Sequence, residues 1–156
     1  AHQLNLAAEI FEGLGPLLEK KHGAKCRWSY GRQEAVMPDG SRWMIQAATP
    51  SRFHGYSPHF IIADEVWGIS PDVLLNGALP SQRVMKSPML SCWSTAGTES
   101  SRAMIQMREE GLRAIDEDRQ TNLYFAEWSV PPYWPLIHRR TSRCIAGFVP
   151  FQWRTE

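Results

Sequence analysis

Residues 60–63 form a short apolar run that ends directly in two carboxylates, Asp64 and Glu65. The run is apolar on both faces, and this pattern is typical of a central parallel strand that helices cover on each side. Ligands of open α/β sheets bind at the carboxyl ends of the strands. We therefore expect a buried strand here, with a candidate site at its end.

Helix and strand patterns alternate along the chain. Apolar residues at three- and four-residue steps predict helices over residues 4–18 and 99–118, and a Ser-Pro-Asp start predicts a shorter helix over 70–80. Strands are predicted at residues 89–95 and 122–128. Together with the apolar run, this order of strands and helices predicts an α/β fold with a parallel sheet flanked by helices.

A second strand-rich region lies between the first predicted helix and the apolar run. Short strand patterns occur at residues 27–30, 34–37 and 42–47. The last two are separated by residues 38–40, Pro-Asp-Gly, which is a turn signal because glycine can adopt positive φ. The region is predicted to form a small hairpin or meander.

Length and charge exclude several classes of protein. A chain of 156 residues fits one domain or a large piece of one, and a net charge of +1 creates no strong field for nucleic acid or an anionic membrane. No apolar run approaches the roughly 18 residues of a membrane span. Cys26, Cys92 and Cys144 lie far apart, which disfavours a zinc ribbon or a redox pair and favours a reducing compartment.

The tail beyond Trp128 differs from the rest of the chain in composition. Residues 129–155 contain no Asp or Glu, while arginines accumulate there among prolines and tryptophans. Three interpretations stay open: a linker that leaves the domain, a basic aromatic surface for nucleic acid, or a stretch read in an altered frame. We therefore separate residues 1–128, the predicted domain, from residues 129–156, a linker or unreliable tail.

The acidic pair has the chemistry of a nucleotide hydrolase site. In such enzymes a first carboxylate holds magnesium, and a second one orients or polarises the attacking water. Asp64 and Glu65 can divide these roles because successive side chains leave a strand end in different directions. The alternative is an acidic pair that caps the next helix or stays in solvent.

Hydroxyl groups follow the next predicted strand. Residues 91–98 include Ser94, Thr95 and Thr98, and these would lie beside the acidic pair if the two strands are neighbours in the sheet. At that position, hydroxyl groups could detect the presence of the γ-phosphate through hydrogen bonds and transmit it to the segments of the protein that move. The alternative is a turn and helix N-cap, in which the hydroxyls satisfy backbone groups.

These segments together resemble the large subunit of tailed-bacteriophage terminases. The matching residues are 50–58, with Arg52 and a His54-Gly55 pair, then 60–67, and then 94–100 with its Ser-Thr-Ala-Gly-Thr element. In that family a His-Gly loop precedes the Walker B strand, and a Ser/Thr-Ala-Gly-Thr coupling motif follows it. The resemblance runs from about residue 4 to residue 128.

The resemblance implies a DNA-packaging motor with a P-loop NTPase fold, which uses ATP and Mg²⁺ in the host-cell cytoplasm. It implies double-stranded DNA, a small terminase subunit and a portal protein as partners, a homo-oligomer during packaging, and no membrane. Asp64 would be the Walker B magnesium residue and Glu65 the catalytic base. The coupling motif would be Ser94, Thr95 and Thr98. Arg52 and His54 would fall in a loop near the site.

The chain also departs from the family pattern. It contains no Gly-x-x-x-x-Gly-Lys-Ser/Thr loop, so no residue that cradles the nucleotide phosphates is identifiable. No acidic cluster follows Trp128 that could hold the metals of the family's nuclease. Since the chain also begins at Ala1 rather than Met, we expect the latter half of a terminase ATPase domain, inactive in isolation.

Two other functions remain open. A helicase-type ATPase fragment would share the Asp-Glu strand end, although Gly97 and the His54-Gly55 pair favour the terminase. A non-catalytic α/β interaction domain would leave Asp64 and Glu65 as surface acids. A serine hydrolase is disfavoured because no Gly-x-Ser-x-Gly elbow is present.

Overall fold

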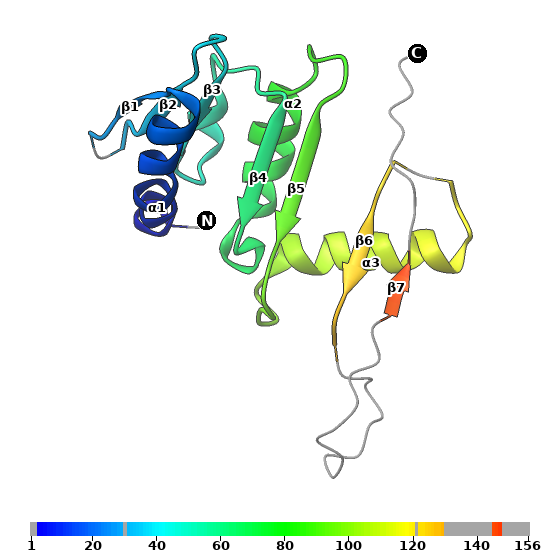
Figure 1. Ribbon diagram of the computed structural model, residues 1–156. Coiled ribbons are helices and arrows are strands. Elements are labelled where there is room, and N and C mark those ends of the chain that lie inside the picture. Colours follow the sequence, from blue (N-terminus) through cyan, green and yellow to red (C-terminus); the bar gives the residue numbers. More distant parts are fainter. Residues whose placement is uncertain (1–2, 30, 121, 130–144, 148–156) are drawn as a thin grey trace. The chain divides into compact units, whose positions relative to one another are not determined.

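A computed structural model describes residues 3–29, 31–120, 122–129 and 145–147 of the chain (Figure 1). The protein is mixed α/β, and its described strands form antiparallel and parallel pairings in separate small sheets. It divides into two compact units, Ala1–Met104 and Ile105–Glu156. None of the helices in the described ranges combines the length and apolar character required to cross a bilayer.

The first helix, α1 (Leu4–His22), confirms the predicted amphipathic helix and extends it by one turn. It ends where Gly23 adopts the left-handed conformation, and the Gly23 N–H donates to the Glu19 carbonyl oxygen over 3.2 Å. A glycine in this conformation is the common helix terminator because it has no Cβ to clash. The basic last turn also complements the negative end of the helix dipole.

The predicted meander is confirmed, although its first strand lies at residues 25–27 rather than 27–30. Strands β1 (Lys25–Arg27), β2 (Glu34–Val36) and β3 (Arg42–Met44) pair antiparallel in that order. The turn between β2 and β3 is closed by the Gly40 N–H, which donates to the Met37 carbonyl oxygen over 3.0 Å, with φ of 84° at Gly40. The Pro-Asp-Gly sequence therefore forms the turn that it predicts.

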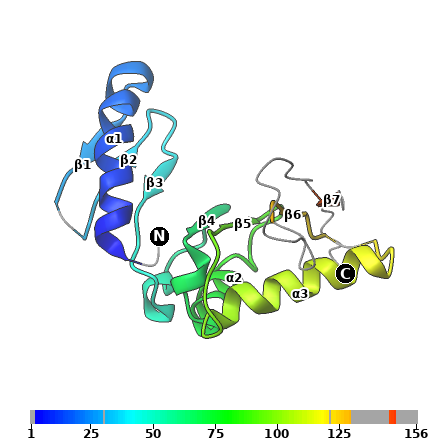
Figure 2. The same cartoon turned by 90° about the horizontal axis from the view of Figure 1, so that it is seen from below.

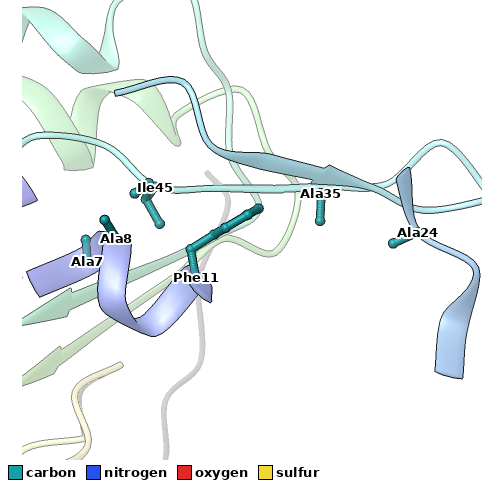
Figure 3. Close-up of a cluster of buried hydrophobic side chains, with 6 residues drawn as sticks. All are labelled: Ala7, Ala8, Phe11, Ala24, Ala35 and Ile45. Atoms are coloured by element: carbon teal, nitrogen blue, oxygen red, sulfur yellow. The ribbon is translucent and has the colours of Figure 1, made fainter. Parts of the chain in front are cut away.

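One face of the meander packs against α1 around Phe11, whose side chain is fully buried at 0% exposure (Figure 3). The Phe11 ring stacks on Trp43 with centroids 5.1 Å apart and meets the edge of Trp28 at 5.2 Å. Gly15 permits this packing, because a Cβ at Gly15 would lie 2.5 Å from the Trp28 ring. The remaining buried members of this cluster are Ala7, Ala8, Ala24, Ala35 and Ile45.

The apolar run forms β4 (Phe60–Asp64), which pairs in parallel with β5 (Met89–Trp93), as the alternating pattern predicted. A helical connection joins the two strands and lies along one face of the pair (Figure 1, Figure 2). It consists of η2 (Val66–Gly68), η3 (Val73–Ala78) and α2 (Leu79–Ser81). The helix predicted over 70–80 is present, but η3 is a π-helix rather than an α-helix.

The expectation that helices cover both faces of β4 is wrong within the described residues. Phe60 is 48% exposed and Ile62 is 56% exposed, whereas Ala63 on the opposite face is buried. The parallel register places Met89 and Trp93 of β5, both more than 45% exposed, on the same uncovered face. Only one helical layer lies against the two strands, so alternate side chains remain in contact with solvent.

The second unit contains most of α3 (Arg102–Asp116), which confirms the helix predicted over 99–118. It also contains β6 (Phe125–Glu127), which pairs antiparallel with β7 (Ile145–Gly147). The prediction that residues 122–128 form a strand is confirmed, but the expectation of a parallel partner is wrong. β6 pairs with β7, a strand that comes later in the chain, and the order of the elements does not indicate this antiparallel pairing.

Gly111 of α3 lies against Phe125, because a Cβ at Gly111 would come within 2.5 Å of the Phe125 ring. Arg108 anchors the same helix to β6 through a bidentate ion pair with Glu127, at 2.7 and 3.1 Å. This bonding holds the pKa of Glu127 below its usual value. The predictions for residues 129–156 lie outside the described residues, apart from Ser129 and the β7 backbone.

Candidate functional site

The acidic pair lies at the carboxyl end of β4. Asp64 is the last residue of the strand, and Glu65 adopts the left-handed conformation with φ of 56° and ψ of 51°. This conformation is uncommon for a residue with a side chain, and such outliers cluster at functional sites. The Glu65 carbonyl oxygen accepts from the Gly68 N–H over 3.0 Å, so the sharp turn is closed by a backbone hydrogen bond.

Two neutral donors hold the Glu65 carboxylate. The Thr95 hydroxyl donates to Glu65 Oε2 over 3.1 Å, and the Trp67 indole N–H donates to the same oxygen. Thr95 follows β5, whose last residue is paired with Asp64. The parallel pairing therefore brings a hydroxyl from one strand end to a carboxylate at the neighbouring strand end.

Ser94 contacts the turn after β4 rather than a carboxylate. Its hydroxyl accepts from the Trp67 backbone N–H over 3.0 Å and donates to the Thr95 carbonyl oxygen over 2.9 Å. This arrangement fixes the turn after β4 against the segment after β5. Ser94 and Thr95 thus bind two different groups of the same turn.

Thr98 is separate from this network. Its N–H donates to Ser101 Oγ over 3.0 Å, and its hydroxyl lies 2.7 Å from Ser100 Oγ. These are the contacts of a turn just before α3, in agreement with the alternative interpretation of this hydroxyl. Of the three hydroxyl residues predicted from the sequence, the structure brings Ser94 and Thr95 to the acidic turn.

Trp67 is a site residue that the sequence reasoning did not single out. It contacts Glu65 through its indole and Ser94 through its backbone, and a Cβ added to Gly97 would lie 2.9 Å from the Trp67 Cβ. The sequence signal that could have identified it is an indole two residues after a carboxylate. A partly buried indole N–H needs an acceptor, and such a carboxylate can provide one. Gly97 is therefore required by close packing against this tryptophan and Ser101.

Asp64 complements Glu65 because its oxygens remain available. In the described part of the chain, the Asp64 carboxylate has no hydrogen-bond or ion-pair partner. Mg²⁺ prefers oxygen ligands and binds through one or two carboxylates together with water and substrate phosphates. Within the described residues, no group of three or more His, Cys, Asp or Glu side chains is placed to hold a metal ion.

Arg52 and His54 precede β4 in the chain, whereas the acidic pair lies at its carboxyl end. Residues 50–58 enter β4 at Phe60, which is the strand end opposite Asp64. In the ranges described, Arg52 and His54 form no hydrogen bond or ion pair with either carboxylate. Arg52 instead lines a cleft beside the meander.

The Asp64 carboxylate offers oxygens of the type that bind cations, and Thr95 and Trp67 hold the Glu65 carboxylate through hydrogen bonds. Such a pair is suited to metal-assisted hydrolysis, in which one acid binds the ion and the other acts on water.

Comparison of the chain with protein-family models, with curated proteins and with solved structures finds no match.

Proposed function

We propose that this chain supplies the Walker B and coupling segments of an ATP-hydrolysing motor, the P-loop-type ATPase domain of a phage terminase large subunit. The observation that carries the proposal is the hydrogen bond from Thr95, after β5, to Glu65, after the parallel strand β4. In this proposal the whole protein translocates double-stranded DNA into a prohead, together with a small terminase subunit and a portal protein.

The two carboxylates have different roles in the proposed reaction. Asp64, whose oxygens are available, would bind Mg²⁺, and the ion neutralises charge on the nucleotide phosphates when it is present. Glu65 would accept a hydrogen bond from the attacking water and orient it. Thr95 and Trp67 position this carboxylate, because both donate to the same oxygen and leave the other one for water.

The same contacts provide a route for coupling. Trp67 contacts Glu65 through its side chain and Ser94 through its backbone. A displacement of the Glu65 carboxylate therefore changes the environment of both Trp67 and Ser94. The Ser94–Gly97 segment is followed by the start of α3. A change in nucleotide state at Glu65 would thereby reach this segment through two hydrogen bonds.

The proposal predicts that the 156-residue chain alone hydrolyses ATP at no more than background rate. Without a phosphate-binding loop the γ-phosphate has no fixed position, and positioning supplies most of the catalysis in phosphoryl transfer. The purified chain would be assayed for phosphate release with Mg²⁺ and ATP. A robust rate that Glu65→Gln abolishes would contradict the expectation that a phosphate loop is missing.

A longer polypeptide that joins these residues to a phosphate-binding loop tests the site itself. There we expect Glu65→Gln to lower kcat by about 100-fold or more, as for loss of a general base, with little change in KM. Glu12→Gln, on the exposed side of α1, is the matched control and should leave kcat unchanged. Equal rates for the two variants would remove Glu65 from catalysis.

A non-catalytic interaction domain is the second candidate. The uncovered apolar face of β4 and β5, with Phe60, Ile62, Met89 and Trp93, favours it because exposed apolar patches mark contact surfaces. The two candidates differ in metal binding. In the longer polypeptide, Mg²⁺ binding that Asp64→Ala leaves unchanged would support the interaction domain, whereas loss of binding would support the ATPase.

A further inference from the structure

A second candidate site lies in a cleft of about 370 Å³ beside the meander, within the first unit. Its walls come from the face of the meander opposite α1, from the turn before β2 and from the 3₁₀ helix η1 (Pro50–Phe53) with the residues after it. The charged and aromatic lining residues are Arg27, Arg32, Glu34, Arg42, Arg52 and Tyr56. Neither Asp64 nor Glu65 lines this cleft.

The cleft is strongly basic because four arginines face a single carboxylate, that of Glu34. Glu34 lies between two of them and binds the guanidinium groups of Arg27 and Arg42, each at 2.9 Å. The register explains this arrangement, since Arg27 is paired directly with Glu34 on the face opposite the Phe11 core. Each guanidinium has five N–H donors, so both retain donors for a further ligand.

The other two arginines have no acidic partner among the residues that the structure describes. Arg32 lies on a closed turn in which its N–H donates to the Ser29 carbonyl oxygen over 2.9 Å. The neighbouring Gln33 is 3% exposed, and its side chain accepts from the Gly31 N–H over 3.0 Å. The backbone that carries Arg32 is therefore held in place from both sides.

Arg52 is also carried by a defined backbone turn. Its N–H donates to the Thr49 carbonyl oxygen over 3.1 Å at the start of η1. Phe53 anchors the same turn against η3, because a Cβ at Gly77 would lie 2.8 Å from the Phe53 ring. Tyr56 follows and adds a half-exposed ring and a hydroxyl donor to the cleft.

We propose that this cleft binds a small, multiply phosphorylated anion through Arg32 and Arg52, with Arg27 and Arg42 as supporting charges. Guanidinium groups bind phosphate oxygens in a bidentate fork, and a concave basic site focuses the field on an anion. The volume lies in the range of small-ligand sites, which favours a compact ligand over the extended backbone of a duplex. The site is independent of the proposed ATPase chemistry.

The test is a calorimetric titration of the 156-residue chain with inorganic tripolyphosphate at about 150 mM salt, where exposed charges are largely screened. We expect the double variant Arg32→Gln/Arg52→Gln to bind at least tenfold more weakly than the unmodified chain. The matched control is Arg83→Gln/Arg102→Gln, which removes the same charge from exposed positions outside the cleft and should change affinity less than twofold.

A milder variant separates charge from geometry. Arg52→Lys keeps the charge but loses the planar fork, and we expect a severalfold loss of affinity with an unchanged circular dichroism spectrum. Equal losses in the two double variants, or no binding of tripolyphosphate by the unmodified chain, would overturn the proposal. If the unmodified chain does not bind tripolyphosphate but binds duplex DNA, and the cleft variants abolish that DNA binding, the cleft would instead be assigned to a nucleic-acid backbone.

Discussion

The region formed by α1 and β1–β3 buries the apolar face of its sheet, whereas the β4–β5 pair leaves one apolar face exposed. In the first region one face of the sheet is closed by α1 around Phe11, and the other face carries charges. In the second, one apolar face remains uncovered and the polar chemistry lies at the strand ends. Both regions bury apolar side chains, but the β4–β5 region also leaves an apolar sheet face exposed and carries the candidate catalytic chemistry.

The difference follows from how each sheet is connected. Antiparallel strands need only short turns, so α1 and the meander form a core from neighbouring segments. A parallel pair needs a crossover connection and is normally buried on both faces. The described residues provide the crossover on one face of β4 and β5 and leave Phe60 and Ile62 in solvent.

The largest expected effect compares two phenylalanines. Phe11→Ala should lower the free energy of unfolding by about 3–5 kcal/mol, because it opens a cavity in a buried cluster. Phe60→Ala removes a half-exposed ring and should cost about 1 kcal/mol or less. Urea unfolding followed by circular dichroism measures both. Equal costs would show that the β4 face is covered in solution.

Two glycines should respond to alanine with opposite signs. Gly97→Ala places a Cβ 2.4 Å from Ser101 Oγ and 2.9 Å from the Trp67 Cβ. Overpacking of this kind costs about 1–3 kcal/mol. Gly13→Ala, inside α1 with nothing within 4 Å, should instead stabilise by about 0.5–1 kcal/mol. Thermal melting distinguishes the two variants. A stabilising effect of Gly97→Ala would show that Gly97 is not closely packed against Ser101 and Trp67.

Two glutamates test how charge is held in each region. Glu34→Gln breaks two ion pairs at the surface of the meander and should lower stability by about 0.5–1 kcal/mol at low salt, and by less at high salt. Glu65→Gln keeps an oxygen acceptor for Thr95 and Trp67, so stability should change by less than about 0.5 kcal/mol. A strong salt dependence for Glu65→Gln would reveal an ionic partner instead.

A further difference concerns the two sides of β5. Burial raises the pKa of the Cys92 thiol from 9.0 to about 11, whereas the neighbouring Trp93 is exposed. At pH 8 the thiolate fraction is lower by about 100-fold, so iodoacetamide should label Cys92 correspondingly slowly, with a rate that rises up to pH 11. Peptide mass spectrometry follows the labelling. The urea-unfolded chain is the control and should react like a free cysteine.

The same shift gives a pH dependence of stability. The native thiol of Cys92 keeps its proton at pH values where the unfolded thiol has lost it. Native protein therefore binds more protons between pH 9 and 11, and stability falls as pH rises through that window. Cys92→Ser should flatten this part of the profile in urea unfolding, and an unchanged profile would place the thiol in contact with water.

Elements with a strong local signal were predictable. The spacing of apolar residues predicted α1, and Pro-Asp-Gly with flanking strand patterns predicted the meander. The apolar run and residues 89–95 predicted two strands of a parallel sheet, and the structure makes them neighbours, which the prediction left as a condition. In each case the deciding contacts lie within one element or between elements adjacent along the chain.

Features that depend on distant segments were not predictable. The antiparallel partner of β6 comes from residues 145–147, and the uncovered face of β4 depends on what packs against it rather than on its own residues. The π-helical turn of η3 changes which backbone groups pair without changing the apolar pattern. The position of Arg52 in the cleft beside the meander also depends on how η1 packs, which its place in the sequence before β4 does not indicate.

For the candidate site, the chemical groups and the strand ends on which they lie follow from the sequence, because an apolar run followed by polar residues is a local pattern. The contacts among these groups follow from the packed strands: Thr95 rather than Thr98 reaches Glu65, and Trp67 joins the two segments. Hydrogen bonds depend on register and on backbone conformation. The left-handed Glu65 and the pairing of Asp64 with Trp93 result from the packed strands together.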